Sequence, residues 1–331
     1  MHQKIDIHTH ILPEKIPNWF EKFGYGDFIW LEHHKPCCAR MMRGDKFFRE
    51  IEENCWEPKA RIVEMDATAV GVQVLSTVPV LFNYWAKTAH AVETSRYFND
   101  HIAQCVTLYP ERFIGLGTVP LQDVDEAIRE MERCIKELKM PGIEIGSNVN
   151  QLNLGEPQFD AFWQAAEELN CSIFVHPWDM MGEQHITKYW LPWLVGMPAE
   201  TARAISSLIF SGVMRKYPKL KFAFAHGGGS FPFTIGRIEH GHKVRPDLCA
   251  IDNEINPREY LGKFWIDSLL HDSKALDYCI DVVGVDKICC GSDYPFPLGE
   301  LDPPGKLIEQ FIADEQAREK MLWKNAQDWL S

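Results

Sequence analysis

The first apolar run of the chain, Ile5–His10, ends in two histidines that are separated by Thr9. Side chains alternate faces along a β-strand, so His8 and His10 point to the same side. Two imidazoles at this spacing suit a single metal ion. Because the pair lies so close to the N-terminus, the other ligands must come from distant parts of the chain. The pattern therefore predicts a fold that brings distant segments of the chain to the end of this first strand.

Three further metal-competent side chains stand at the ends of apolar runs. His176 and His226 each end such a run, and Asp293 follows another in a Ser-Asp-Tyr-Pro turn. Singly, each has an ordinary explanation as a hydrogen-bonded histidine or a turn former. Five such groups at the ends of four runs predict a metal site. The remaining histidines are interpreted as surface or local structural residues: His2, His33, His34, His90, His101, His185, His240, His242 and His271.

Apolar runs alternate with amphipathic helical patterns along nearly the whole chain. Eight runs are predicted as strands: 5–10, 72–77, 113–117, 142–146, 172–176, 221–226, 264–268 and 287–291. Residues 125–138 illustrate the helical spacing, since apolar residues recur there at three- and four-residue steps. Eight strand–helix repeats predict an α/β fold of the (β/α)8 TIM-barrel type. The alternative is an open doubly wound sheet, but no G-x-G-x-x-G fingerprint follows the first run.

The segment 13–58, between the first strand and its helix, is long, aromatic and rich in turn residues. We interpret it as an insertion over the barrel mouth. The chain has no internal repeat beyond the strand–helix period and no convincing linker, so residues 1–331 are predicted to form one domain. Active sites of such barrels are built at the carboxyl ends of the strands, where the five candidate groups stand.

Composition narrows the class of protein. The chain has 331 residues, of which 46% are hydrophobic, and a net charge of −13, which argues against nucleic-acid binding. No apolar run approaches the roughly 18–20 residues of a membrane span, and the early first strand leaves no room for a signal peptide. Ten scattered cysteines without a CxxC pattern favour reduced thiols in a cytoplasmic protein.

The arrangement of these groups resembles the amidohydrolase superfamily, whose metal-bearing barrels carry HxH on strand one, His on strands five and six, and Asp on strand eight. The resemblance covers the whole chain. One departure is informative: residues 142–146 on strand four contain no lysine, whereas binuclear members carry a carbamylated lysine there. This implies one metal ion with four protein ligands: His8, His10, His176 and Asp293. His226 is then free for acid–base catalysis, alongside Asp293.

Four longer strings resemble a group of decarboxylases in that superfamily that act in kynurenine catabolism: 176–182, 189–200, 226–233 and 291–300. This resemblance implies a single Zn²⁺ per chain, a homodimer and a small dicarboxylate semialdehyde as substrate. It also implies a set of substrate-binding residues: Arg49, Trp193, Arg237, Arg245 and Phe296. Without the resemblance, the arginines would be interpreted as solvated surface charges and the aromatic residues as ordinary core.

The chemistry implied is non-oxidative loss of CO₂. Direct loss from an sp² carbon would leave a poorly stabilised carbanion, so that carbon must first become tetrahedral. A zinc ion with an open position can activate water for this addition, and His226 can accept the proton. No organic cofactor is expected.

Two of the arginines are expected to act across a dimer interface. Arg237 is eleven residues after His226, so a helical path carries it roughly 12–16 Å along the axis, at about 1.5 Å per residue. A reach back to the metal of the same chain is then awkward. The resemblance likewise implies that Arg237 and Arg245 complete the site of the neighbouring subunit.

Three alternatives remain open at this point. The same ligands serve a metal-dependent hydrolase of a lactone or an amide. They also serve a decarboxylase of an aromatic acid such as a resorcylate. A barrel without catalytic activity, serving as a binding or scaffold protein, is disfavoured because every ligand position is filled.

Overall fold

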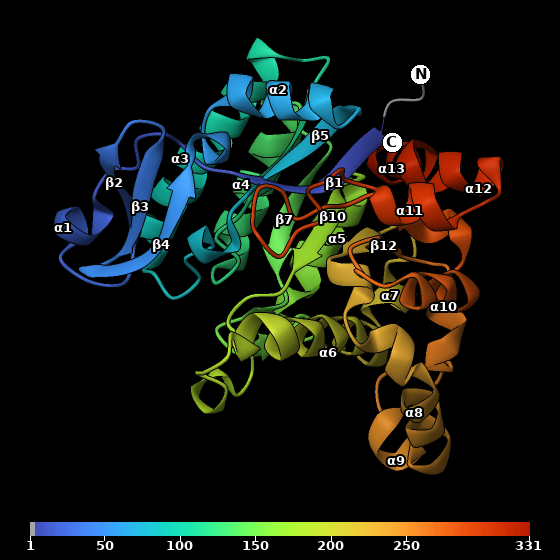
Figure 1. The fold of residues 1–331 in the computed structure, drawn as a ribbon. Helices are drawn as coiled ribbons and strands as arrows, with labels where there is room; N and C mark the ends of the chain where they lie inside the picture. Colours follow the sequence, from blue (N-terminus) through green and yellow to red (C-terminus); the bar gives the residue numbers. More distant parts are fainter. Residues whose placement is uncertain (1–3) are drawn as a thin grey trace.

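The computed structural model describes residues 4–331, in which eight parallel strands form a central barrel (Figure 1). The strands follow in the order of the chain: β1 (Lys4–Ile11), β5 (Val70–Thr77), β6 (Phe113–Thr118), β7 (Gly142–Gly146), β10 (Ser172–His176), β11 (Lys221–Phe224), β12 (Trp265–Asp267) and β13 (Ile288–Cys289). The first and last strands meet where the N–H of Ile7 donates to the carbonyl of Cys290 at 2.9 Å and Thr9 bridges to Tyr294. The predicted TIM-type barrel is confirmed.

Burial explains why these runs become strands. Every residue of β1, β7 and β10 is buried, as expected for parallel strands that are covered on both faces. Each predicted run overlaps one barrel strand, but the last three strands are shorter than predicted. The run 221–226 stops being a strand at Phe224, because His226 and Gly227 turn into the left-handed region at φ 57° and 63°. His226 therefore stands just beyond its strand.

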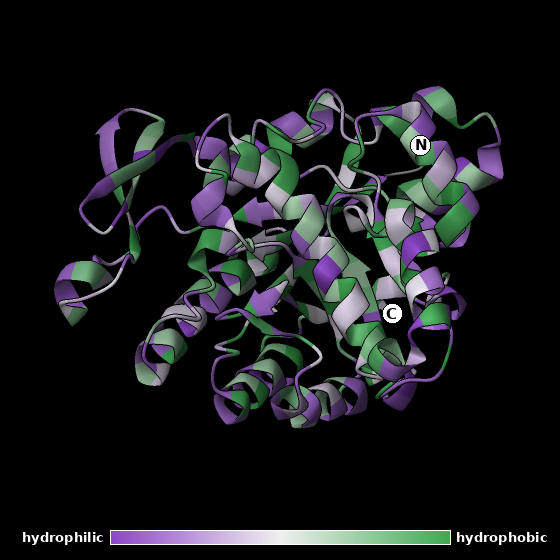
Figure 2. Ribbon diagram, turned by 90° about the horizontal axis from the view of Figure 1, so that it is seen from below, coloured by the Kyte–Doolittle hydropathy of each residue, from purple (hydrophilic) through white to green (hydrophobic). Residues whose placement is uncertain are grey.

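Helices cover the outside of the barrel, and Figure 2 shows that they carry both hydrophobic and hydrophilic bands. They comprise α2 (Pro58–Ala67), α3 (Thr88–Leu108), α4 (Val124–Lys136), α5 (Asp160–Glu168), α6 (Met197–Phe210), α7 (Val213–Lys216), α8 (Phe231–Val244), α9 (Pro246–Cys249), α10 (Ser273–Val283), α11 (Lys306–Phe311), α12 (Glu315–Glu319) and α13 (Asn325–Leu330). The predicted helix at 125–138 is α4, which buries Ala127, Met131 and Cys134. Asp123 caps it by accepting a hydrogen bond from the N–H of Glu126.

Residues 13–58 contain α1 (Trp19–Phe23) and an antiparallel sheet of β2 (Ile29–Lys35), β3 (Cys38–Arg43) and β4 (Lys46–Glu52). This sheet was not predicted. The segment lies to one side of the barrel and packs on α3, where the rings of Phe23 and His90 stack at 3.7 Å (Figure 1). The assignment of the whole chain to one domain stays a prediction.

The closing helix, α13, covers the amino-terminal end of the barrel. Trp329 is fully buried, and its carbonyl accepts a hydrogen bond from the hydroxyl of Ser172 at 2.6 Å. This leaves the carboxyl ends of the strands as the open face. Among the helices of residues 4–331, none is long and apolar enough to cross a membrane. His2, assigned above to the terminus, lies outside the described residues.

Candidate metal centre and active site

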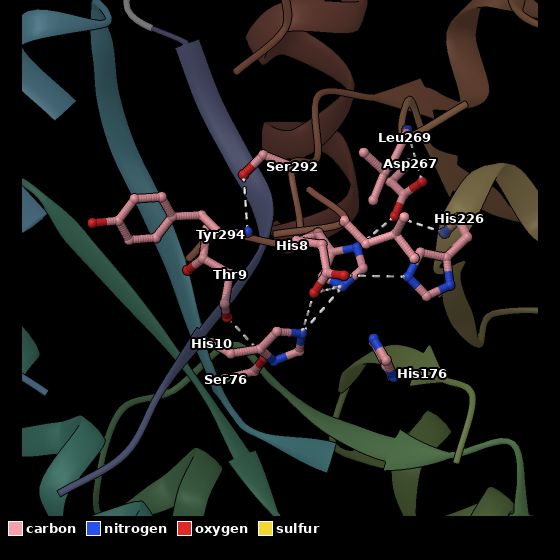
Figure 3. A network of polar contacts seen from close by, with 12 residues as sticks. His8, Thr9, His10, Ser76, His176, His226, Asp267, Leu269, Ser292 and Tyr294 are labelled. Carbon is pink, nitrogen blue, oxygen red and sulfur yellow. Dashed lines mark hydrogen bonds and ion pairs between the residues drawn. The ribbon is translucent and has the colours of Figure 1, made fainter. Parts of the chain in front are cut away.

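The five predicted metal-competent groups meet at the carboxyl ends of the barrel strands (Figure 3). The Nε2 atoms of His8 and His10 are 3.2 Å apart, and Oδ1 of Asp293 lies 3.5 Å and 3.1 Å from them. The ring of His176 is 5.0 Å from both rings, and the ring of His226 is 5.0 Å from that of His176. Residues far apart in the sequence thus form one cluster.

Three of the four histidines are oriented by a hydrogen-bond partner on the side of the ring that faces away from the cluster. Each holds its Nδ1 against an acceptor: His8 against Asp267 at 2.6 Å, His10 against the carbonyl of Thr77 at 2.9 Å, and His176 against the carbonyl of Pro177 at 3.0 Å. A carbonyl oxygen can only accept, so Nδ1 of His10 and His176 carries the hydrogen. Their Nε2 atoms therefore present lone pairs to the centre of the cluster, as in protein metal sites.

This donor set fits a divalent cation. Nε2 of His176 is buried without a hydrogen-bond partner in the described chain. The 3.2 Å separation of the His8 and His10 nitrogens is close to the distance of about 3.4 Å between two ligands of a tetrahedral ion bound at about 2.1 Å. Two imidazole nitrogens this close can share one cation, either a proton or a metal ion. Imidazole nitrogens with one carboxylate are ligands typical of zinc and similar metals.

The carboxylate in the cluster is held in its anionic form. Burial alone would raise the pKa of Asp293, but its interactions with the imidazoles of His10 and His226 outweigh this effect and hold it well below its usual range. The backbone at Asp293 adopts φ 59°, an uncommon conformation for a residue other than glycine, and its N–H donates to the carbonyl of His8 at 2.9 Å. The turn thus directs a negative charge at the histidines.

The imidazoles differ in their affinity for a proton. Burial lowers the pKa of His10, and it lowers the pKa of His176 well below its usual range. Burial also disfavours charge on His8, but Asp267 and Asp293 outweigh it and raise its pKa. Neutral imidazoles are the form that binds metal, so a metal must displace a proton chiefly from His8.

His226 occupies a different environment from the other three histidines. Its Nε2 lies 3.8 Å from Oδ2 of Asp293, close enough to belong to the cluster by proximity. However, its Nδ1 is buried and has no hydrogen-bond partner within residues 4–331. No acceptor therefore fixes its tautomer. This favours the predicted division of roles, in which His226 handles protons and the anchored histidines hold the metal.

Three predicted substrate-binding residues lie together at the mouth. Arg49, on β4, places its guanidinium 4.9 Å from the ring of Phe296 and 5.8 Å from that of Trp193, and it lines the same cavity as His10 and Asp293. No described carboxylate lies within ion-pair distance of this half-buried guanidinium. The positive charge of Arg49 therefore faces the candidate metal centre without an ion-pair partner among the described residues.

The cavity at the histidines is small, about 40 Å³, and two wider ones of about 390 Å³ and 600 Å³ also include Trp193 in their walls. Trp193 belongs to a π-helical turn, Pro192–Gly196, that begins α6. A cavity of about 610 Å³ beside α6 and α9 is the largest of the described set, but it contains none of the five candidate groups. Cavity volume alone therefore does not identify the candidate metal centre.

Arg237 and Arg245 are not brought to the site of their own chain. Arg237 is exposed on α8, and Arg245 is exposed beyond the end of that helix, paired with Asp247 at 2.7 Å. Figure 1 shows α8 and α9 extending away from the barrel. The structure therefore places both arginines away from the candidate metal centre of their own chain.

The sequence prediction missed two carboxyl groups of the site. Asp267 ends β12 and accepts hydrogen bonds from His8 and from the backbone of His226. Glu144 lies on β7, 3.7 Å from Nδ1 of His10, and burial raises its pKa well above the usual range. Both residues stand on the inner side or end of a barrel strand, and that position was the available signal.

Comparisons with known proteins identify the family to which the chain belongs. The sequence pattern of the family described as amidohydrolase matches residues 5–331. A 2-amino-3-carboxymuconate-6-semialdehyde decarboxylase of Dictyostelium discoideum is 56% identical over 99% of this chain and 91% of its own length. A protein of the same name from Caenorhabditis elegans is 40% identical over 98% of this chain and 93% of its own.

More distantly related proteins are named as decarboxylases of aromatic acids. A gamma-resorcylate decarboxylase of Polaromonas is 29% identical over 86% of this chain and 90% of its own. A dihydroxybenzoic acid decarboxylase from Polaromonas, solved with bound manganese and an inhibitor, has a TM-score of 0.80 at 23% identity over 100% of this chain and 97% of its own. That structural match supports the fold alone. The chain belongs to the amidohydrolase superfamily and, within it, to the family of 2-amino-3-carboxymuconate-6-semialdehyde decarboxylases.

Proposed function

We propose that the protein catalyses the non-oxidative decarboxylation of 2-amino-3-carboxymuconate 6-semialdehyde to 2-aminomuconate 6-semialdehyde, with one Zn²⁺ per chain held by His8, His10, His176 and Asp293. The observation that carries the proposal is the convergence of these donors in the cavity that Arg49 also lines. The names of the two relatives with 56% and 40% identity supply the substrate.

Substrate binding follows from the charges around the cavity. The proposed substrate has two carboxylates, and a guanidinium binds a carboxylate through two parallel hydrogen bonds. Arg49 is available for this because aromatic rings surround it in place of an acidic partner. Phe296 and Trp193 limit access of water and pack against the unsaturated carbon chain. The carboxylate that is lost would then lie beside the metal ligands.

A divalent metal bound at this site supplies Lewis-acid activation of water. The role of His226 would be to accept the proton of that water as its oxygen adds to the carbon next to the one that bears the departing carboxylate. The same imidazole can return the proton to the carbon that bears the carboxylate, which completes the addition and makes that carbon tetrahedral. The carbon–carbon bond to the carboxylate then breaks with release of CO₂. Its electron pair restores the double bond as hydroxide leaves the neighbouring carbon, and a proton from solvent converts the hydroxide to water.

A protonation change at His226 is compatible with its surroundings. Its Nε2 faces Asp293 at 3.8 Å, and its Nδ1 has no competing acceptor among the described residues. Imidazole is the side chain most often used in enzymes to accept and return a proton. Asp293 contributes to the same step, since its anionic charge stabilises the imidazolium form.

We further propose that the active unit is a homodimer in which Arg237 and Arg245 reach the partner's site and bind the second carboxylate. Their exposure on the projecting α8 region supports this arrangement. The expected compartment is the cytoplasm, which agrees with ten cysteines that are all free thiols. Mn²⁺ is the alternative metal, since a neighbour of the same fold was solved with it.

The second candidate function is decarboxylation of an aromatic acid, favoured by the relative named gamma-resorcylate decarboxylase. An absorbance assay with the freshly generated semialdehyde, with and without a chelator, tests the first function. Parallel reactions with 2,6-dihydroxybenzoate test the second. Loss of the semialdehyde signal with release of CO₂, abolished by the chelator and restored by Zn²⁺, is the expected result. Turnover of the aromatic acid alone, or ring or amide opening without CO₂, would reject the proposed substrate.

A further inference from the structure

A fully buried arginine lies behind the candidate metal centre. Arg61, on α2, has no exposed surface, and its Nη1 donates to the carbonyl of His10 at 2.7 Å and to that of Asn54 at 3.1 Å. Its Nε donates to Oε1 of Gln73 at 3.1 Å. All three acceptors are neutral, and no carboxylate of the described chain lies within ion-pair distance of it. A full positive charge is thus buried against backbone carbonyls.

An aromatic ring also packs against the flat face of the Arg61 guanidinium. Its central carbon lies 4.6 Å from the centre of the Tyr294 ring, a cation–π distance. Tyr294 follows the ligand Asp293 directly, and its hydroxyl donates to Glu64 of the same helix at 2.6 Å. Burying an arginine without a counter-ion is costly, and a fold retains such a group where its geometry serves a purpose.

The contacts of Arg61 join three segments that each carry a residue of the site. The carbonyl that it binds belongs to the ligand His10, and the ring that it covers is adjacent to the ligand Asp293. The carbonyl of Asn54, which Arg61 also binds, lies two residues after the end of β4, the strand that carries Arg49. The planar guanidinium of an arginine has five N–H donors and can bridge these positions, whereas the single ammonium group of a lysine cannot.

We propose that Arg61 is a positioning residue that sets the geometry of the metal centre by holding His10 and the Asp293–Tyr294 turn at a fixed separation. This inference rests on the metal ligands of the proposed function. It assigns to Arg61 no contact with substrate or metal. Its removal should therefore alter the ligand field and the affinity of the ion, even in protein that remains folded.

The experiment compares Arg61→Met and Arg61→Lys with the unmodified dimer, each loaded with Co²⁺ as a spectroscopic probe. Arg112→Met is the matched control, because Arg112 also bonds backbone carbonyls, at Gly71 and Val70, but contacts no candidate ligand. Co²⁺ absorption, Co²⁺ affinity by chelator competition, thermal unfolding, kcat and KM are measured for each. For Arg61→Met we expect a changed Co²⁺ spectrum and 10- to 100-fold weaker Co²⁺ binding, the usual cost of losing support behind a metal ligand.

Arg61→Lys should recover part of the affinity, since an ammonium reaches one carbonyl but does not stack or bridge. If Arg61→Met does not fold, Gln73→Met replaces it, because this change removes one acceptor of the guanidinium and leaves the arginine in place. A folded Arg61→Met protein with the unmodified Co²⁺ spectrum and affinity would overturn the inference. Failure of the unmodified protein to bind Co²⁺, or a spectrum unchanged in His176→Ala, would instead reject the metal centre of the proposed function.

Discussion

The carboxylate of Asp267 lies 2.6 Å from Nδ1 of His8, and both side chains are fully buried. The same carboxylate accepts hydrogen bonds from the backbone N–H groups of His226 at 2.9 Å and Gly227 at 2.7 Å (Figure 3). One side chain thus orients a proposed metal ligand and also fixes the turn that presents the proposed acid–base group. The position of His226 relative to His8 therefore depends on this carboxylate.

Replacement of this carboxylate tests the link. Asp267→Asn should reduce both metal affinity and kcat by about 10- to 100-fold, because an amide has one acceptor oxygen and cannot serve the imidazole and the turn together. Metal titration and steady-state kinetics measure the two effects. Asp272→Asn is the matched control, since Asp272 caps α10 through Lys274 and Ala275 and contacts no candidate ligand. Equal behaviour of the two variants would remove Asp267 from the site.

Metal content should be one ion per chain. His8→Ala and His176→Ala each remove an anchored Nε2 donor, so both should lose the metal and turnover together. Prolonged chelation of the unmodified protein should give the same loss, reversed by stoichiometric Zn²⁺. Elemental analysis of active protein, with activity followed during back-titration, provides the measurement. Two tightly held ions per active chain would contradict the single-metal prediction drawn from the missing lysine in 142–146.

His226→Ala should separate catalysis from metal binding. Because His226 has no acceptor behind Nδ1, its loss leaves the anchored donors in place. We expect most of the metal to be retained while kcat falls by roughly 10²–10⁴, the usual size of a general-base effect. Metal analysis and kinetics on one preparation give the comparison with His176→Ala. Near-normal turnover would exclude His226 from the mechanism, and loss of the metal would make it a ligand.

The sequence was sufficient for the barrel and for the five converging groups because both depend on local patterns. Buried parallel strands read as apolar runs, and barrel sites lie at strand ends, so His176 and Asp293 could be assigned to one place without coordinates. The left-handed backbone at His226 was not foreseen, and the predicted strand was therefore two residues too long.

Supporting residues were harder to predict because their roles depend on contacts across the fold. Asp267 is one aspartate among many until its position beside His8, 259 residues away, is known. Arg61 sits in a helix of ordinary composition, and its burial comes from Tyr294 and the strands behind it. The sheet β2–β4 was missed because its mixed polar pattern belongs to a small, partly exposed sheet.

Acid should destabilise the fold through His101, on α3. Burial lowers the pKa of His101 to about 4, from an ordinary value of 6.5. Between these values the unfolded chain binds a proton that the folded chain does not, so the free energy of unfolding falls as pH falls from about 6.5 to about 4. The contribution is at most about 3.4 kcal/mol, from 1.36 kcal/mol per pKa unit.

Chemical denaturation of the chelated protein across this range measures the slope, and His101→Gln should flatten it. Chelation keeps metal release out of the comparison, and the difference between the two proteins cancels the other titrating groups. An unchanged slope in His101→Gln would show that His101 does not titrate as its burial implies.

Sharing of arginines between subunits can be tested by complementation. Arg237 is exposed on α8 and Arg245 lies beyond its end, so neither contacts the candidate centre of its own chain. Arg237→Ala and His226→Ala should each be nearly inactive alone. In a mixed dimer, one site collects both defects and the other has neither, so activity should return toward one quarter of the unmodified level after random exchange of equal amounts.

The exchange itself needs an independent readout, because absence of activity has two possible causes. Two affinity tags of different type, one on each variant, allow the mixed dimer to be isolated and its activity measured directly. A mixture of His226→Ala with His176→Ala is the control, because both defects lie at the centre of their own chain and no mixed dimer then contains an intact site. Activity in the isolated Arg237→Ala mixture and none in the control would establish the shared site. An isolated mixed dimer without activity would place Arg237 outside the partner's site, whatever its contribution to the dimer.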